Sequence, residues 1–154
     1  MTSEAKAKAL ADLAAAHVAF KEAVRGIPED RLSVPMHGEW SAKDIVAHVS
    51  SWNEMSALDM RRLARRHVPC IAAFREADVN EWNAFLMRPR KLFPAAQVLS
   101  ELEGSYGMLV EALAAVPQAR FEPGNMLPNV LAILVGHYGE HGRHIKEWRE
   151  GEGV

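Results

Sequence analysis

The 154-residue chain has a net charge of −2 at neutral pH, with 49% hydrophobic and 25% charged residues, a composition typical of a globular domain. This length can bury a full core, so we expect a single domain over residues 1–154. The charge balance gives no general attraction to nucleic acid or anionic membranes, and no apolar run approaches the roughly 20 residues of a membrane span. Cys70 is the only cysteine and the first residues lack the order of a signal peptide, which together predict a cytoplasmic protein.

The first half of the chain contains two long predicted helices. The first covers about residues 3–25 and stops at the segment 25–28, where a basic residue, a glycine and a proline follow one another. The second begins at Ser41, because Ser41 and Asp44 have the spacing of a capping box. Its apolar pattern continues to about residue 66.

The segment 67–93 is the irregular part of the chain, since its prolines interrupt any long helical pattern. Within it, Asp78 and Glu81 form a second pair with capping-box spacing, which predicts a short helix through Trp82. We expect this segment to lie over the bundle like a lid.

Two more long helices are predicted in the second half of the chain. One opens at Pro94 and closes near Pro117, and the last opens near Pro128 and runs to about Arg149. No segment shows the alternation of a strand. The sequence therefore predicts an all-α four-helix bundle, with a short extra helix between the second and third long helices.

Glycines recur every three residues within the last predicted helix, at Gly136, Gly139 and Gly142. Each costs about 1 kcal/mol relative to alanine in a helix interior, so the row needs a compensating contact. We expect it to pack closely against another helix, either inside the bundle or across a homodimer. Local softness beside the neighbouring histidines is the alternative.

The histidines of the last predicted helix are the most informative residues of the chain. His137 and His141 are four residues apart and lie about 40° from one another around the helix, so both can bind one ion. His144 is about 10.5 Å from His137 along the axis, too far to share a metal easily. With His48 from the second helix, the pair would form a three-ligand site with an open position, as in catalytic metal sites.

Ordinary explanations compete with a metal site. Histidines on amphipathic helices are often solvated or hydrogen-bonded in a core. The residues 137–141 also match the H-x-x-E-H pattern of inverted zinc peptidases, with Glu140 as the base. Glu140 lies about 100° around the helix from His141, so it reaches at best past the edge of the ion.

Three other features have both a functional and an ordinary interpretation. The basic cluster 61–67 could hold an anionic substrate or nucleic acid, but basic residues also suit a helix C-terminus. Cys70 has no base near it in the sequence and is typical of a small buried hydrophobe. Trp52 and Trp82 are expected core residues that could also form the wall of an apolar pocket.

Two segments resemble the DinB superfamily of bacterial four-helix bundles. Residues 38–52, GEWSAKDIVAHVSSW, are similar to the family signature GWS-x-KD-x-x-AH-x-x-x-W. Residues 137–145, HYGEHGRHI, resemble its closing H-Y-x-E-H-x-x-x-I helix. Between them, residues 78–83, DVNEWN, resemble the D-V-N-x-x-N segment of the ClbS/DfsB-like branch. The order and spacing of these motifs match over about residues 10–149.

The resemblance implies a divalent-metal site formed by His48, His137 and His141, in a family whose members are often dimers. Characterised members are thiol-dependent transferases and isomerases, which use bacillithiol, mycothiol or glutathione, or hydrolases of reactive electrophiles. Many members have no known activity. His144 departs from the family pattern and leaves the register of the histidine pair open.

These observations predict a metal-dependent enzyme that acts on a small electrophilic molecule by hydrolysis or thiol transfer, in detoxification or self-protection. The expected cofactor is Zn²⁺ or Ni²⁺, with water or a low-molecular-weight thiol in the open position. Asp44 and Glu140 are candidate bases or supports for the ligands, and otherwise surface carboxylates. Trp52 and Trp82 are candidate substrate contacts. A homodimer is expected, with neither nucleic acid nor membrane as a partner.

The alternative is a non-catalytic bundle that binds a small molecule or acts in a stress response, with a vestigial metal site. The metal content of protein purified without a His-tag distinguishes the two. Stoichiometric metal that is lost in His48→Ala favours the enzyme, whereas the absence of metal favours the binding module.

Overall fold

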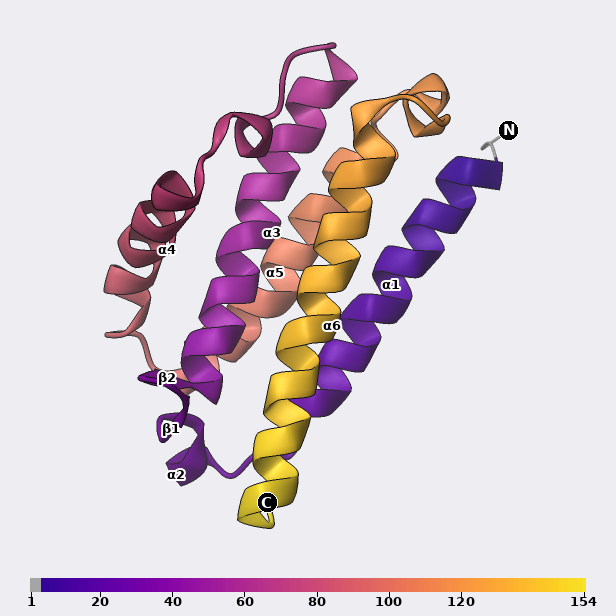
Figure 1. Ribbon diagram of the computed structural model, residues 1–154. Coiled ribbons are helices and arrows are strands. Elements are labelled where there is room, and N and C mark those ends of the chain that lie inside the picture. Colours follow the sequence, from indigo (N-terminus) through magenta and orange to yellow (C-terminus); the bar gives the residue numbers. More distant parts are fainter. Residues whose placement is uncertain (1–3) are drawn as a thin grey trace.

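The computed structural model describes residues 4–154 and contains a bundle of four long helices (Figure 1). They are α1 (Glu4–Val24), α3 (Ala42–Ala64), α5 (Ala95–Ala114) and α6 (Met126–Glu152). The predicted all-α bundle is confirmed, with the long helices close to their expected positions. Within the bundle, α3 packs mainly against α5, and α6 packs mainly against α1.

A small antiparallel hairpin precedes α3 and corrects the expectation that the chain has no strand. After the short helix α2 (Glu29–Leu32), β1 (Pro35–His37) pairs with β2 (Trp40–Ser41). Gly38 begins the two-residue turn with φ of 60°, a left-handed conformation that glycine adopts without steric cost. Strands this short cannot display an alternating pattern, so periodicity does not predict them.

The capping box predicted at the start of α3 is present. The Ser41 side chain accepts a hydrogen bond from the Asp44 backbone N–H at 3.1 Å, and the Asp44 carboxylate accepts one from the Ser41 N–H at 3.0 Å. The cap fixes where α3 begins and places the following turn against the hairpin. By fixing the start of α3, this capping box also positions His48.

The predicted short helix is longer than expected, since α4 covers Glu76–Arg90 and contains Pro89. The proposed pairing of Asp78 with Glu81 is wrong: the helix starts earlier, and the Asp78 carboxylate accepts from the Arg75 backbone N–H at 2.8 Å. Pro89 lies one residue before the end of α4, so the hydrogen bond that it lacks is missing from the last turn and not from the middle of the helix.

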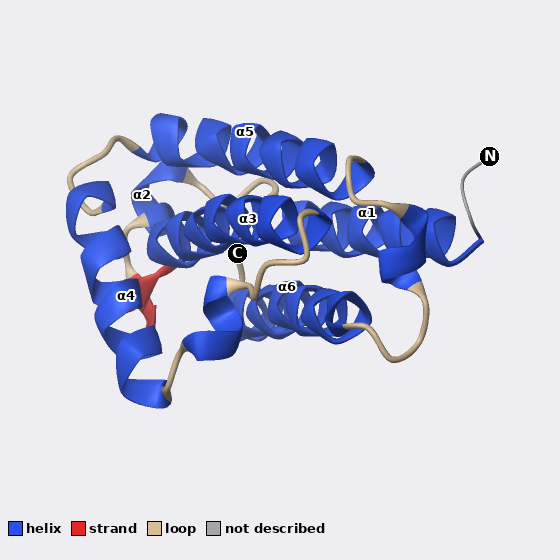
Figure 2. Ribbon diagram, turned by 90° about the horizontal axis from the view of Figure 1, so that it is seen from above, coloured by secondary structure: helices blue, strands red, loops and turns tan. Residues whose placement is uncertain are grey.

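Helix α4 lies on the outer flank of the bundle beside α3, as the view from above shows (Figure 2). Two one-turn 3₁₀ helices complete the connections, at Cys70–Ala73 (η1) and Gln118–Phe121 (η2). No helix within residues 4–154 is long and apolar enough to cross a membrane.

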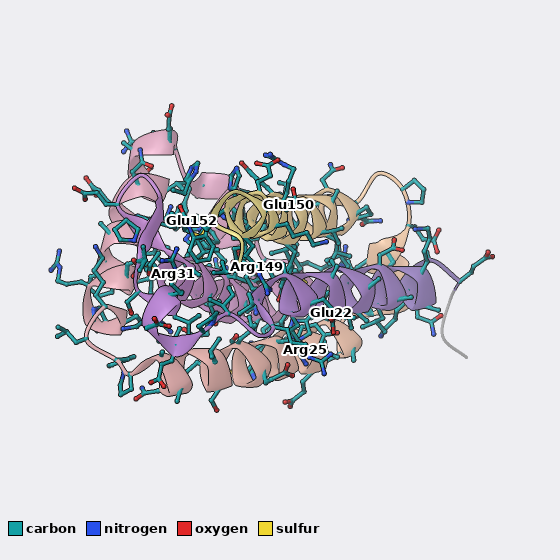
Figure 3. The ribbon with its side chains drawn as sticks, turned by 90° about the horizontal axis from the view of Figure 1, so that it is seen from below. Glu22, Arg25, Arg31, Arg149, Glu150 and Glu152 are labelled. Carbon is teal, nitrogen blue, oxygen red and sulfur yellow. The ribbon has the colours of Figure 1, made fainter. Side chains whose placement is uncertain are left out.

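The end of α6 is tied to the end of α1 and to α2 by polar contacts. The Arg149 Nη1 donates to the carbonyl oxygens of Ala23 at 2.9 Å and Arg25 at 2.7 Å. The Arg31 Nη2 donates to the Glu152 carboxylate at 2.6 Å. Figure 3 shows this end of the bundle, with Arg31, Arg149 and Glu152 close together. These contacts fix how far α6 is shifted along its own axis. They therefore also fix the level in the bundle at which His137 and His141 lie.

The glycine row of α6 does not pack as a unit inside the bundle. A Cβ built on Gly142 would lie 3.8 Å from the Phe20 Cα of α1, an ordinary van der Waals separation, so this glycine faces α1 but the packing does not require its missing side chain. Gly136 and Gly139 are exposed, and a Cβ on either would meet no atom within 4 Å among the described residues. The intramolecular expectation is wrong for these two because residues three apart rotate by about 60° per step around a helix. A homodimer contact there stays a prediction.

Candidate metal centre

Three imidazoles from two helices converge at one point of the bundle. His48 lies in the second turn of α3, and His137 and His141 lie one turn apart on α6. The Nε2 of His48 is 2.8 Å from the Nε2 of His137, which is 3.1 Å from the Nε2 of His141. The potential ligand atoms of all three residues lie within 4.8 Å of one another. The structure thus brings together the histidines that the sequence singled out.

The separations of the three nitrogens fit a metal ion after a small adjustment. Two nitrogen ligands of a tetrahedral zinc ion are about 3.3 Å apart, given bonds of roughly 2.0–2.1 Å. The observed separations are a few tenths of an ångström shorter, which slight rotation of the rings corrects. A ring nitrogen holds either one proton or one lone pair, so the His137 Nε2 cannot satisfy two such neighbours well. A single cation satisfies all three nitrogens at once.

Burial keeps these imidazoles neutral. Loss of hydration, with smaller contributions from His137 and His141, lowers the pKa of His48 to about 2. Burial likewise lowers the pKa of His137 to about 3 and that of His141 to about 4. A neutral imidazole offers a lone pair, which is the form that binds a metal. All three side chains are therefore in the ligating state at neutral pH.

Two tryptophans form the walls beside the histidines. The ring of Trp40, on β2, lies 4.9 Å from that of His48 in an edge-to-face arrangement. The buried Trp52 lies one turn after His48, with its ring 6.4 Å from His48 and 6.3 Å from His137. Trp40 is not among the substrate contacts expected from the sequence, because the hairpin that turns it toward His48 has no sequence signal.

Helix α4 is joined to this wall by one hydrogen bond. The Trp52 Nε1 donates to the Asn83 Oδ1 at 2.8 Å. Trp82, the other expected substrate contact, lies instead among aromatic neighbours of its own segment, Phe74 at 6.0 Å and Phe85 at 6.1 Å between ring centroids. The contribution of α4 to the site thus comes through Asn83.

The two candidate carboxylates have different surroundings. Asp44 is engaged in the cap of α3, where both the backbone and the hydroxyl of Ser41 donate to its Oδ2 at 3.0 Å. Glu140 is exposed, and its negative charge counteracts the lowering of the His141 pKa. His144 lies outside the cluster, stacked on His37 of β1 with 4.5 Å between ring centroids.

A buried polar network crosses between the helices next to the histidines. The Tyr138 hydroxyl donates to the Asn53 Oδ1 at 2.7 Å, and the Asn53 Nδ2 donates to the Ser105 Oγ at 3.1 Å. Tyr138 directly follows His137, and Asn53 lies five residues after His48. We call the contact surface formed by His48, Asn53, His137, Tyr138 and His141 the α3–α6 seam.

The α3–α6 seam fixes the relative position of two helices that otherwise pack mainly against other partners. Burial raises the pKa of Tyr138, so its hydroxyl stays protonated and donates to Asn53. Sequence reasoning missed this network. Neither a single asparagine nor a single tyrosine in an apolar helix carries a signal of a partner 85 residues away.

The remaining candidates lie away from the triad. Cys70 follows the far end of α3, and its backbone N–H donates to the Asp59 carboxylate at 2.6 Å. Asp59 is itself buried and also accepts from the Ile71 N–H at 3.1 Å, so it caps η1. In the basic cluster, the Arg62 Nε donates to the Val68 carbonyl at 2.8 Å and closes the end of the helix.

The family model of the DinB superfamily matches residues 12–145, a span that contains all three histidines. The chain belongs to the DinB superfamily. No curated protein and no solved structure gives a match. Membership of this superfamily agrees with the helical bundle, and it agrees with a triad that can hold a metal ion.

Proposed function

We propose that this DinB superfamily protein is a divalent-metal-dependent enzyme acting on a small electrophilic molecule, with His48, His137 and His141 as the ligands. The observation that supports it most strongly is the convergence of three neutral Nε2 atoms from two helices. Nitrogen ligands of this kind suit Zn²⁺ or Ni²⁺. When bound, such an ion lowers the pKa of a coordinated water or thiol and thereby supplies a nucleophile at neutral pH.

The protein's own side chains determine which molecules suit the site. Three neutral imidazoles contribute no charge, so the centre remains cationic and favours an anionic nucleophile. Trp40 and Trp52 exclude water and offer aromatic surface to an apolar reactant. Glu140, exposed and adjacent to His141 in the chain, is the carboxylate available to carry a proton to or from solvent.

We place the protein in the ClbS/DfsB-like branch, and propose hydrolysis or thiol transfer in detoxification or self-protection as its activity. The support is the D-V-N-x-x-N segment on α4, whose Asn83 accepts the hydrogen bond from the Trp52 indole beside the triad. This contact gives a reason for an asparagine at that position in a protein that also carries the triad.

The test begins with the metal content of tag-free protein by elemental analysis. We expect one Zn²⁺ or Ni²⁺ per chain in the wild-type protein and none in His48→Ala. The metal-loaded protein is then treated with a panel of epoxides, cyclopropanes and alkyl halides, with and without low-molecular-weight thiols. Turnover that chelation abolishes and the metal restores supports the enzyme, whereas equal rates after chelation refute it.

A non-catalytic binding module is the competing function. One observation favours it: the separation of 2.8 Å between the Nε2 atoms of His48 and His137 equals a hydrogen bond, which needs no metal. In that case His48→Ala changes no metal content, and the whole electrophile panel remains intact. The same two measurements therefore separate the two functions.

A further inference from the structure

A pocket lies beside α4, on the other side of Trp40 from His48. It has a volume of about 410 Å³, enough for part of a small organic molecule, and is formed between β2 and α4. The lining residues that enter the argument are Trp40, Asn83, Met87, Arg88 and Lys91.

This pocket shares residues with the wall of the metal centre. One side of it is Trp40, whose ring also contacts His48 at 4.9 Å. Another side is Asn83, which is hydrogen-bonded to Trp52, the tryptophan beside His48 and His137. A molecule whose reacting atom lies at the triad can therefore extend past Trp40 into the pocket.

The polar atoms of the pocket are mostly hydrogen-bond donors. An indole N–H can only donate, so the Asn83 atom facing Trp52 is the oxygen, and the Asn83 amide nitrogen is left to donate elsewhere. Arg88 and Lys91 add positive charge, and none of the lining residues is a carboxylate. A third cation is close by, because the Lys43 Nζ donates to the Lys91 carbonyl at 3.1 Å.

We propose that this pocket binds a carboxylate group of the small-molecule reactant, with Arg88 and Lys91 as the residues that select it. The proposal deepens the proposed function, on which it rests, since it names an anionic organic acid as the class of reactant. Donors and cations favour an anionic acceptor. The apolar surface of Trp40 and Met87 favours an organic molecule over an inorganic ion.

The test uses cobalt-loaded protein and two series of thiols as probes. One series carries a carboxylate (mercaptoacetate, mercaptopropionate, mercaptobutyrate and mercaptohexanoate), and the other carries a neutral alcohol on chains of the same lengths. Thiolate binding to cobalt gives a charge-transfer absorption band, which measures affinity without catalysis. We expect at least one carboxylate thiol to bind about three- to tenfold more tightly than the alcohol of equal length.

The variants identify the residues responsible. Arg88→Gln combined with Lys91→Gln should remove the preference for the carboxylate while leaving the affinity for the neutral thiols unchanged. Arg61→Gln combined with Arg65→Gln, which removes the same charge at the far end of α3, should keep the preference. Both pairs are exposed, and each double variant loses two positive charges. The Arg61/Arg65 variant therefore controls for the change in net charge.

The outcomes separate this proposal from the function on which it rests. If neutral thiols give the cobalt band but no chain length shows a carboxylate preference, the pocket proposal is wrong and the metal centre stands. A preference that survives in the Arg88/Lys91 double variant also overturns the assignment. If no cobalt binds, the metal centre itself is wrong. Direct titration of the apoprotein with the same carboxylates then decides whether the pocket binds anions independently.

Discussion

The helix pairs α3–α5 and α1–α6 are held together differently from the α3–α6 seam. The pairs pack through buried apolar side chains such as Leu13, Phe20, Leu109 and Leu113. Across the seam, the Nε2 atoms of His48 and His137 approach each other, and the Tyr138 hydroxyl donates a hydrogen bond to Asn53. Apolar contacts are non-directional and supply stability, whereas hydrogen bonds are directional and fix register. The apolar helix pairs thus supply the stability of the bundle, and the α3–α6 seam positions the candidate metal centre.

The first prediction breaks the seam at its centre. His137→Ala should abolish metal binding, with a loss of more than 100-fold in affinity, because the His137 Nε2 lies between those of the other two histidines. Isothermal titration with Zn²⁺ and circular dichroism would show a folded protein that binds no metal. His144→Ala, which removes the ring stacked on His37, should bind as the wild type does. Equal affinities for both variants would contradict the assignment of the ligands.

The second prediction breaks a helix pair instead. Leu109 of α5 is fully buried, so Leu109→Ala should lower the free energy of unfolding by about 2–5 kcal/mol through lost burial and a cavity. Urea unfolding of the apoprotein measures the loss. Zinc affinity of the folded fraction should stay within about twofold of the wild type. A large loss of affinity here would show that stability and metal geometry are not separate.

The third prediction concerns the polar network of the seam. Tyr138→Phe keeps the buried ring but leaves the Asn53 Oδ1 without its donor, which costs about 1–3 kcal/mol. Because Tyr138 adjoins His137, the affinity for metal should also fall, and the cobalt d–d spectrum should broaden as the ligand geometry loosens. Ser105→Ala, at the other end of the network, should destabilise without altering the spectrum. Identical spectra for wild type and Tyr138→Phe would limit the network to a structural role.

The sequence predicted the parts of this molecule that depend on local pattern. Apolar periodicity located the four long helices, and the spacing of Ser41 and Asp44 located the start of α3. The spacing of His137 and His141 put both on one face of α6, where the structure brings them to His48. These features depend on residues within one or two turns of each other.

The parts that were missed depend on contacts between distant segments. The hairpin is too short for a pattern, and Trp40 meets His48 only because of it. The partner of Asn53 lies on another helix, and the glycine row contacts α1 only at Gly142. Proline at the end of α4 was interpreted as a break, although a last turn tolerates it. Local reasoning has no access to such long-range geometry.

The fourth prediction uses pH to compare the seam with a histidine elsewhere in the core. His17 of α1 is buried and stacks on Tyr106 of α5 at 3.7 Å between ring centroids, and burial is the main cause of its lowered pKa. The unfolded chain therefore binds a proton near pH 6.5 that the folded chain does not. The stability contribution of neutral His17 is present above this pH and is lost as the pH falls toward the folded pKa.

His17→Phe should consequently reduce the loss of stability between pH 7 and pH 5, measured by urea unfolding of the apoprotein. The groups facing His17 are Glu103, which raises its pKa, and Lys21, which lowers it. The histidines of the seam titrate in both proteins, so their contribution cancels in the difference. If the free energy of unfolding depends on pH with equal slope in the wild type and in His17→Phe, then His17 is protonated to the same extent in the folded and unfolded chain.

The last prediction has the smallest effect and tests the exposed glycines of α6. In a monomer, Gly139→Ala should stabilise the protein by about 0.5–1 kcal/mol, because alanine costs less backbone entropy and meets no neighbour. Gly142→Ala should gain at least as much, because its Cβ would make an ordinary van der Waals contact with Phe20 at 3.8 Å. In a homodimer that buries Gly139, the same alanine would instead weaken association as the protein is diluted. Unfolding measured at two protein concentrations separates these cases: a concentration-independent gain assigns Gly139 to solvent, and a concentration-dependent loss assigns it to a contact between two copies of this chain.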